Sequence, residues 1–250
     1  MATVLLVRHG RTAANSTGIL AGRSPGVELD EVGRQQAAML GERLAPIPVT
    51  RLISSPLQRC RQTAHALLAA RADPVPNSVE SRLTECGYGD WTGRPLKELA
   101  KESLWQTVQQ QPSAVRFPGG EAMTEMAARA VGAVRAWDAD VTAEHGAEAV
   151  WVAVSHGDVI KAILADALGT HLDTFQRILV NPASVSVIRY TTARPYVVTM
   201  NSAGGDLAGM FPPRKPAAKR SRRTRRSRSA ADDAPVGGGL GAQDSNAEAG

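Results

Sequence analysis

Five short apolar runs, separated by helical patterns, most constrain the fold of this chain. The runs are rich in β-branched residues, which is typical of buried strands, and they cover residues 3–7, 51–55, 150–154, 184–190 and 196–200. The helical patterns run from Gly33 to Leu44, from Cys60 to Leu67, from Met123 to Val141, and from just after Gly157 to near Gly169. Strands that alternate with helices of this length predict a three-layer α/β/α sandwich with a mostly parallel sheet.

The chain divides into a folded region, residues 1–211, and a C-terminal tail, residues 212–250. Large apolar side chains almost disappear from Pro212 onward. Such a segment cannot bury enough apolar surface to offset the entropy of ordering, so we expect the tail to be disordered. Within the folded region, residues 74–120 show weak periodicity and many Pro and Gly. We expect them to cover the edge of the sheet at which a ligand would bind.

The net charge of +5 comes entirely from the tail. Residues 214–228 carry nine Lys and Arg, and the Gly- and Ala-rich residues that follow carry four acids, which leaves twenty basic and twenty acidic residues in the folded region. We expect the basic segment to be part of a solvated extension without a partner. Non-specific contact with a polyanion such as nucleic acid or acidic lipid is the alternative. Because the tail lacks aromatic residues, sequence-specific nucleic-acid binding is not expected.

No apolar run approaches the roughly 20 residues needed to span a bilayer. The apolar run 4–7 lacks a charged leader and is followed at once by Arg8 and His9, so it does not resemble a secretory signal, and a cytoplasmic location is expected. Cys60 and Cys86 form neither a CxxC pair nor a zinc-type spacing. We expect two reduced, partly buried thiols and no metal site, with sensitivity to oxidation as an alternative.

Two histidines share one local context, because each is followed by glycine and lies just past a predicted buried strand. These pairs are His9–Gly10 and His156–Gly157. In an open α/β sheet, ligands bind beyond the carboxyl ends of the strands, so the two histidines are predicted to face one another across one crevice. The glycines let backbone N–H groups approach a bound anion. The other histidines, His65, His145 and His171, lack this context and receive no role.

Several groups suited to binding an anion accumulate at the same edge. Arg8 directly precedes His9, and Asn15 follows six residues after His9 with an amide donor. Ser55 is predicted as the N-cap of a helix whose first turn carries Arg59, and a helix N-terminus favours a phosphate. Arg61 is expected to point toward solvent.

Five motifs, in a fixed order, carry a family resemblance. They are RHGRTAAN (8–15), SSPLQRCRQTA (54–64), LTECGYGDWTG (83–93), FPGGE (117–121) and VSHGD (154–158). In order and spacing they resemble the signatures of the histidine phosphatase superfamily, also called phosphoglycerate mutase-like, over residues 3–200. The forms GYGDWTG and PGGE are similar to its phosphatase branch.

The resemblance implies roles for individual residues. His9 is the implied nucleophile and Glu85 the implied proton donor to the leaving group. Arg8, Arg59 and His156 are implied to clamp the phosphoryl group. Asn15 is implied as an auxiliary donor, and no cofactor or metal is implied. The chemistry agrees, because adjacent guanidinium groups would lower the pKa of His9, and burial among Cys86, Tyr88 and Trp91 would raise the pKa of Glu85.

The implied activity is hydrolysis of a phosphomonoester through a phosphohistidine, on a small phosphorylated metabolite. A cofactor-dependent phosphoglycerate mutase is the alternative, although residues 94–116 offer only Arg94, Lys97, Lys101 and Arg116 and lack the adjacent arginine pair of the mutases. The physiological substrate and the oligomeric state stay open, and a homodimer is one option.

Two patterns of hydrolase type are set aside. The GxSxG pattern at residues 22–26 has no strand before its serine and contains a Pro-Gly turn signal. The series Ser155, His156 and Asp158 does not predict a triad, because neighbours at one strand end point apart.

Overall fold

A six-stranded mixed sheet lies at the centre of the computed structural model, in the strand order β3-β2-β4-β1-β5-β6. The strands are β1 (Thr3–Arg8), β2 (Val49–Ser54), β3 (Asn77–Val79), β4 (Val150–Ser155), β5 (Val185–Arg189) and β6 (Tyr196–Ser202). The structure describes residues 1–204. The predicted boundary at residue 211 and the predicted tail, 212–250, therefore lie outside the described residues.

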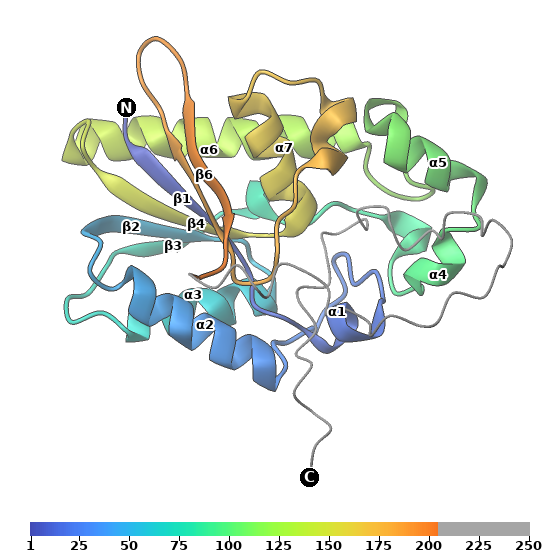
Figure 1. Cartoon of the computed structure of the whole chain (residues 1–250), viewed down its shortest axis with the longest axis horizontal. Coiled ribbons are helices and arrows are strands. Elements are labelled where there is room, and N and C mark those ends of the chain that lie inside the picture. Colours follow the sequence, from blue (N-terminus) through green and yellow to red (C-terminus); the bar gives the residue numbers. More distant parts are fainter. Residues whose placement is uncertain (205–250) are drawn as a thin grey trace, which may run out of the picture.

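Two pairs of helices cover the two faces of the sheet, as Figure 1 shows. The helices α2 (Glu31–Leu44) and α3 (Gln58–Ala69) pack on one face, and α6 (Met123–His145) and α7 (Gly157–Ala167) pack on the other. In β1, Leu5 and Val7 belong to the core beneath α2 and α3, while Val4 and Leu6 belong to the core beneath α6 and α7. This alternation is the two-residue period of a strand buried on both faces. The predicted α/β/α sandwich is confirmed.

The sheet is parallel from β3 through β1 and antiparallel beyond. Strands β3, β2, β4 and β1 pair in parallel, whereas β5 runs antiparallel to β1, and β6 antiparallel to β5. The prediction of a mostly parallel sheet is thus correct. The edge strand β3 was not predicted, since it has only three residues and lies where the sequence has weak periodicity.

The remaining elements are short, and most of them fall within residues 74–120. They are α1 (Ala13–Thr17), η1 (Ser81–Leu83), η2 (Gly89–Trp91), α4 (Leu96–Leu99), α5 (Ser103–Gln110), η3 (Pro112–Ala114) and η4 (Leu172–Arg177). Leu83, Trp91 and Leu99 are buried and anchor this irregular region to the core beneath α6 and α7. In Figure 1, α1, α4 and α5 lie at the side of the molecule toward which β1 and β4 run.

The start of α3 differs from the prediction that Ser55 is its N-cap. The helix begins at Gln58, and the N-cap residue Leu57 makes no side-chain capping bond. The Ser55 hydroxyl instead lies 2.7 Å from Nε2 of His156, and the Leu57 N–H donates to it at 3.4 Å. The hydroxyl is therefore used at the strand end, and the helix starts two residues later than predicted. The end of α7 agrees with prediction, because Gly169 follows it with a φ of +67°.

Glycine is required where the loop after β1 meets α2. A Cβ on Gly33, in the first turn of α2, would lie 1.9 Å from the Arg11 carbonyl oxygen, and a Cβ on Gly10 would lie 2.4 Å from the Gly33 carbonyl oxygen. No side chain fits at either approach. The N-terminus of α2 therefore rests directly against the backbone that follows His9.

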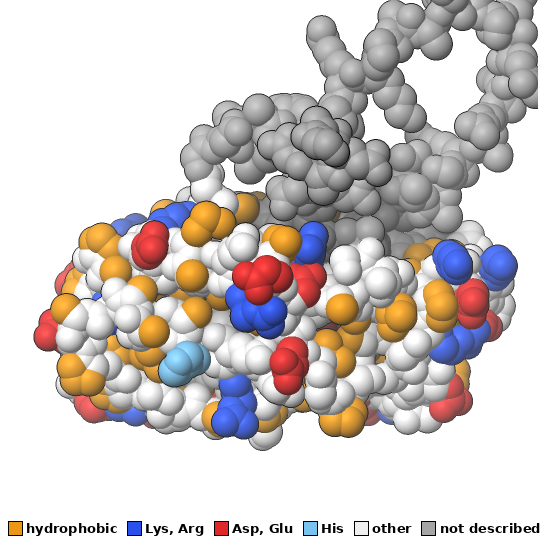
Figure 2. Space-filling view, turned by 90° about the horizontal axis from the view of Figure 1, so that it is seen from below, with side chains coloured by type: hydrophobic (Ala, Val, Ile, Leu, Met, Phe, Trp, Pro, Cys, Tyr) orange, Lys and Arg blue, Asp and Glu red, His pale blue; other side chains and the backbone are white. Residues whose placement is uncertain are grey.

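The surface carries basic and acidic side chains side by side on the face that Figure 2 shows, which is the side of α2 and α3. This mixture agrees with the balance of charge counted in the folded region. None of the helices within residues 1–204 is sufficiently long and apolar to cross a bilayer.

Candidate active site

The carboxyl ends of β1 and β4 bring His9 and His156 together. The two strands pair with Arg8 opposite Ser155, so the next residue of each strand lies at the same edge of the sheet. The His9 N–H donates to the Ser155 carbonyl at 3.0 Å. The centroids of the two imidazole rings lie 5.3 Å apart, and the ring planes are inclined by 63°. The repeated His-Gly context thus marks two strand ends that meet at one site.

His9 is held in a single tautomer by its neighbours. Its Nδ1 lies 2.7 Å from the Gly10 carbonyl oxygen, which can only accept a hydrogen bond, so Nδ1 carries the proton. The lone pair on Nε2 accepts a hydrogen bond from Nε of Arg59 at 3.3 Å. Burial, followed by the charges of Arg59 and Arg8, lowers the pKa of His9 well below its ordinary value. At neutral pH the ring is uncharged, with Nε2 as its nucleophilic atom.

Two buried arginines stand beside this imidazole. Arg8 is fully buried at the end of β1, and its Nη1 donates to the Val180 carbonyl at 2.6 Å. Burial lowers the pKa of Arg8 to about 10, which leaves it cationic at neutral pH. Arg59, in the first turn of α3, donates from Nη2 to the Gly22 carbonyl at 2.7 Å. Backbone carbonyls therefore fix two positive charges beside the His9 imidazole, and guanidinium groups are suited to binding anions.

His156 is fully buried and is oriented by a serine. Its Nε2 and the Ser55 hydroxyl share a hydrogen bond of 2.7 Å, and its Nδ1 lies 3.9 Å from Oε2 of Glu85. Burial is the largest cause that lowers the pKa of His156, and Arg59, His9 and Arg8 add to it. His156 thus lies close both to the His9 imidazole and to the Glu85 carboxyl group.

Glu85 lies in the irregular segment between η1 and η2 and is only 4% exposed. Its Oε1 accepts the Cys86 N–H at 2.9 Å. Burial, and then the nearby Asp158 carboxylate, raises the pKa of Glu85 to about 7, against the opposing charges of Arg59 and Arg8. Near neutral pH this carboxyl group therefore exists both as acid and as base, which is what a group that gives and takes a proton requires.

The two remaining predicted site residues have clear places in the fold. Gly157 is buried, is the first residue of α7, and follows His156, the N-cap residue of that helix. Asn15 is the third residue of α1, and its Oδ1 accepts from the N–H and the hydroxyl of Thr12 at 3.1 and 2.9 Å. The Asn15 oxygen is therefore used to cap α1, and the role of its amide nitrogen as a phosphate donor stays a prediction.

Some groups at the site escaped the sequence analysis. Ser55 was selected for a different role, and Asp158 was set aside with the rejected triad. Asp158 in fact accepts from the Tyr88 hydroxyl at 2.8 Å and lies 3.4 Å from Nζ of the buried Lys161. Its position in the VSHGD motif was the available signal. Arg129 binds the backbone around Glu85, and it lies in α6, where the sequence predicted a helix and no site residue.

The patterns set aside earlier have other structural roles. Ser155 donates to the Leu83 carbonyl at 2.8 Å, and residues 22–26 form turns with no strand before Ser24. Arg61 is exposed, as expected. Within residues 1–204, no three or more His, Cys, Asp or Glu side chains are grouped as metal ligands.

Both cysteines are free thiols, and both are fully buried, whereas partial burial was predicted. Cys60 lies 3.5 Å from Nε2 of His156 and is completely inaccessible to solvent. Burial raises the pKa of Cys60 to about 12 and raises that of Cys86 further. Because the thiolate is the reactive form, these surroundings disfavour the alternative of oxidation sensitivity.

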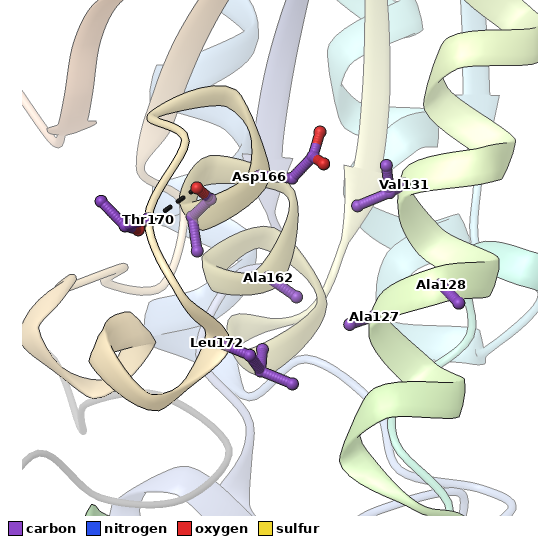
Figure 3. A pocket seen from close by; sticks show the side chains of 8 residues that line it. Ala127, Ala128, Val131, Ala162, Asp166, Thr170 and Leu172 are labelled. Carbon is purple, nitrogen blue, oxygen red and sulfur yellow. Dashed lines mark hydrogen bonds between the residues drawn. The ribbon is translucent and has the colours of Figure 1, made fainter. Parts of the chain in front are cut away.

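A groove of about 270 Å³ between α6 and α7 is separate from these residues (Figure 3). Mostly small side chains line it, namely Ala127, Ala128, Val131, Ala162, Ala165, Asp166, Thr170 and Leu172. Asp166 is bound by Arg135 at 2.8 Å. None of the predicted site residues lines this groove.

Comparison with known proteins agrees with the resemblance in the motifs. The family model described as "Histidine phosphatase superfamily (branch 1)" matches residues 4–203. A relative from Yersinia pestis, named "Probable phosphoglycerate mutase GpmB", is 30% identical over 217 residues, which cover 85% of this chain and 97% of the relative.

Solved structures share the same fold. YhfR of Bacillus stearothermophilus superposes with a TM-score of 0.72 at 26% identity, over 81% of this chain and 98% of YhfR. A mycobacterial glucosyl-3-phosphoglycerate phosphatase in complex with VO3 gives a TM-score of 0.70 at 25% identity, over 80% and 98% of the two chains. The α-ribazole phosphatase of Shigella flexneri gives 0.68 at 25% identity, over 82% and 98%.

Proposed function

Since the chain belongs to branch 1 of the histidine phosphatase superfamily and is an enzyme of that type, we propose that it hydrolyses small phosphomonoesters through a phosphohistidine on His9. The observation that carries the proposal is the state of His9. Its Nδ1 proton is directed to the Gly10 carbonyl, and its Nε2 lone pair accepts a hydrogen bond from the Arg59 guanidinium, which places the nucleophilic nitrogen next to a fixed positive charge. A phosphoryl group attracted to the arginines would meet the nucleophilic nitrogen.

In the first step, His9 Nε2 attacks phosphorus, the P–N bond forms and the bond to the ester oxygen breaks. Arg8, Arg59 and His156, with the Gly157 N–H and the Asn15 amide, would hold the phosphoryl oxygens. The leaving oxygen takes a proton from the protonated carboxyl group of Glu85. The pKa of Glu85, about 7, supports this role, because the acid form is populated at neutral pH.

In the second step, water attacks the phosphorus of the phosphohistidine while the Glu85 carboxylate accepts a proton from that water. The P–N bond breaks, inorganic phosphate leaves, and His9 and Glu85 return to their initial states. Arg8 and Arg59 supply positive charge in both steps, which is the contribution that a metal ion makes in other phosphatases.

Hydrolysis is favoured over mutase activity. The Yersinia relative carries a mutase name, but two solved neighbours carry phosphatase names. A mutase must retain a bisphosphorylated cofactor, which requires additional cations. Of the four basic residues in 94–116, Arg94 is bound to Glu102 at 2.6 Å and Arg116 is bound to Glu125. The other two basic residues of this range, Lys97 and Lys101, are exposed.

The deciding experiment measures phosphate release over a panel of phosphorylated metabolites, with chelator present, for the wild type and for His9→Ala. We expect turnover only in the wild type, and an acid-labile phosphate on residue 9 in samples quenched during turnover. Absence of that adduct, or loss of activity on adding EDTA, would overturn the proposal. Rapid conversion of 3-phosphoglycerate to 2-phosphoglycerate with catalytic 2,3-bisphosphoglycerate would establish the mutase instead.

A second function rests on the basic segment 214–228, which has nine Lys and Arg among fifteen residues. Such a segment supports non-specific, salt-dependent contact with polyanions. Binding to a DNA duplex of arbitrary sequence should weaken steeply with salt and vanish on deletion of residues 212–250. Binding that survives the deletion would contradict this function.

A further inference from the structure

The backbone of the segment that carries Glu85 is bound by the guanidinium group of Arg129. Arg129, on α6, donates from Nη1 to the carbonyl oxygens of Arg82 and Thr84, at 2.6 and 2.7 Å. Its Nη2 donates to the carbonyl oxygen of Glu85 at 3.1 Å. One planar side chain therefore binds three carbonyl groups within four residues. The segment itself lies between two short 3-10 helices and has no strand or α-helix to fix it.

Glu121 completes this support. It accepts from Nε and Nη2 of Arg129 at 2.6 and 3.0 Å, and also from the Gly87 N–H at 3.0 Å. Arg23 approaches from the exposed side and donates to Glu121 and to the Glu85 carbonyl oxygen, at 2.9 and 2.8 Å. The segment is thus bound through its carbonyl groups by two arginines and through an N–H by the carboxylate between them.

We propose that Arg129 is a positioning residue that acts through the backbone of Glu85, with Glu121 and Arg23 as its partners. This inference rests on the proposed role of Glu85 as proton donor. None of the three supporting side chains needs to touch the phosphoryl group, because they fix the main chain from which the Glu85 carboxyl group projects. A displacement of about 1 Å can reduce a rate by roughly 100-fold when a catalytic group must meet its proton acceptor.

A positioning role for an acid predicts a dependence on the leaving group. The alkoxide released from β-glycerol phosphate is strongly basic and needs a proton as it departs, whereas the weakly basic p-nitrophenolate does not. The quantity to compare is kcat/KM, which reports the step up to departure of the leaving group and is insensitive to later hydrolysis of the phosphohistidine. An acid displaced from its place therefore lowers kcat/KM for β-glycerol phosphate selectively.

The experiment compares Arg129→Met and Glu85→Gln with the wild type on both substrates. We expect Arg129→Met to lose about 10- to 100-fold on β-glycerol phosphate and to stay within about threefold on p-nitrophenyl phosphate. Glu85→Gln should show the same selectivity with a larger loss. Because Arg129 acts through Glu85, adding Arg129→Met to Glu85→Gln should cause little further selective loss. The matched control is Arg135→Met, which removes an exposed arginine of the same helix that binds Asp166.

The outcomes separate the inference from the proposed function. Equal losses on both substrates for Arg129→Met, or selective losses that add in the double variant, would overturn the positioning role. If Glu85→Gln itself lacks selectivity, the proposed acid is wrong. Should Arg129→Met not fold, Arg23→Met tests the same network from the surface, where the side chain is 44% exposed. It should give a smaller loss with the same selectivity, and an unselective result would count against the inference.

Discussion

The two halves of the candidate site are built by different means. His9, Arg8 and His156 lie at the ends of adjacent parallel strands, so the sheet's backbone hydrogen bonds set their positions. Glu85 lies in an irregular segment, and side chains of α6 and two loops hold it in place. The strand-borne half depends on register, whereas the loop-borne half depends on a few charged hydrogen bonds. We therefore expect the two halves to respond differently to substitution.

The largest expected effect is in the strand-borne half. His9→Ala removes the proposed nucleophile, so kcat/KM should fall by roughly 10⁴-fold or more on any phosphomonoester. The loss should be independent of the leaving group, because no phosphoryl transfer can begin. A steady-state phosphate assay measures it, with thermal unfolding as the control for folding. Substantial residual turnover would show that another group receives phosphorus.

The next effect is in the loop-borne half and depends on pH. The raised pKa of Glu85, about 7, implies that its acid form is lost as the pH rises through that value. For an alkyl phosphate, kcat/KM should therefore decline above about pH 7. Glu85→Gln should reduce the rate by roughly 10²- to 10³-fold and should abolish this decline. A decline that persists in Glu85→Gln would assign the titration to another group.

A smaller effect is expected for Ser55→Ala, which removes the hydroxyl bound to Nε2 of His156. The imidazole keeps its place at the end of β4 but loses the bond that orients it. We expect a decrease of about tenfold in kcat/KM, equal for good and poor leaving groups. A larger loss for the poor leaving group, as expected for Glu85→Gln, would mean that His156 takes part in proton transfer. The two halves of the site would then not be functionally distinct.

The smallest effect is on stability. The pKa of Glu85 is raised on folding from about 4.5 to about 7, so the folded protein binds the proton more tightly than the unfolded chain does. Stability should therefore fall between about pH 4.5 and pH 7 and then level off. The penalty is on the order of 1–3 kcal/mol. Urea unfolding at pH 5 and pH 8 should show this loss in the wild type and a reduced loss in Glu85→Gln.

The difference between the halves also explains what the sequence could predict. His9 and His156 were found because buried strands leave a clear pattern and because glycine follows both histidines. The sandwich and its four main helices followed from the same periodicity. Ser55 was assigned as a helix cap, since the sequence does not reveal that its hydroxyl binds His156. Arg129 escaped entirely, because a contact across the molecule with three backbone carbonyl groups leaves no local pattern.

The contact between Gly33 and the Arg11 carbonyl places a severe constraint on a residue that has no part in the proposed chemistry. A Cβ at residue 33 would lie 1.9 Å from that oxygen and would push α2 away from the loop that supplies the Gly10 carbonyl. In a library of random variants scored for activity, position 33 should tolerate substitution as poorly as position 9. Intolerance at that position would reflect the close approach of two backbone segments rather than any contact with the substrate.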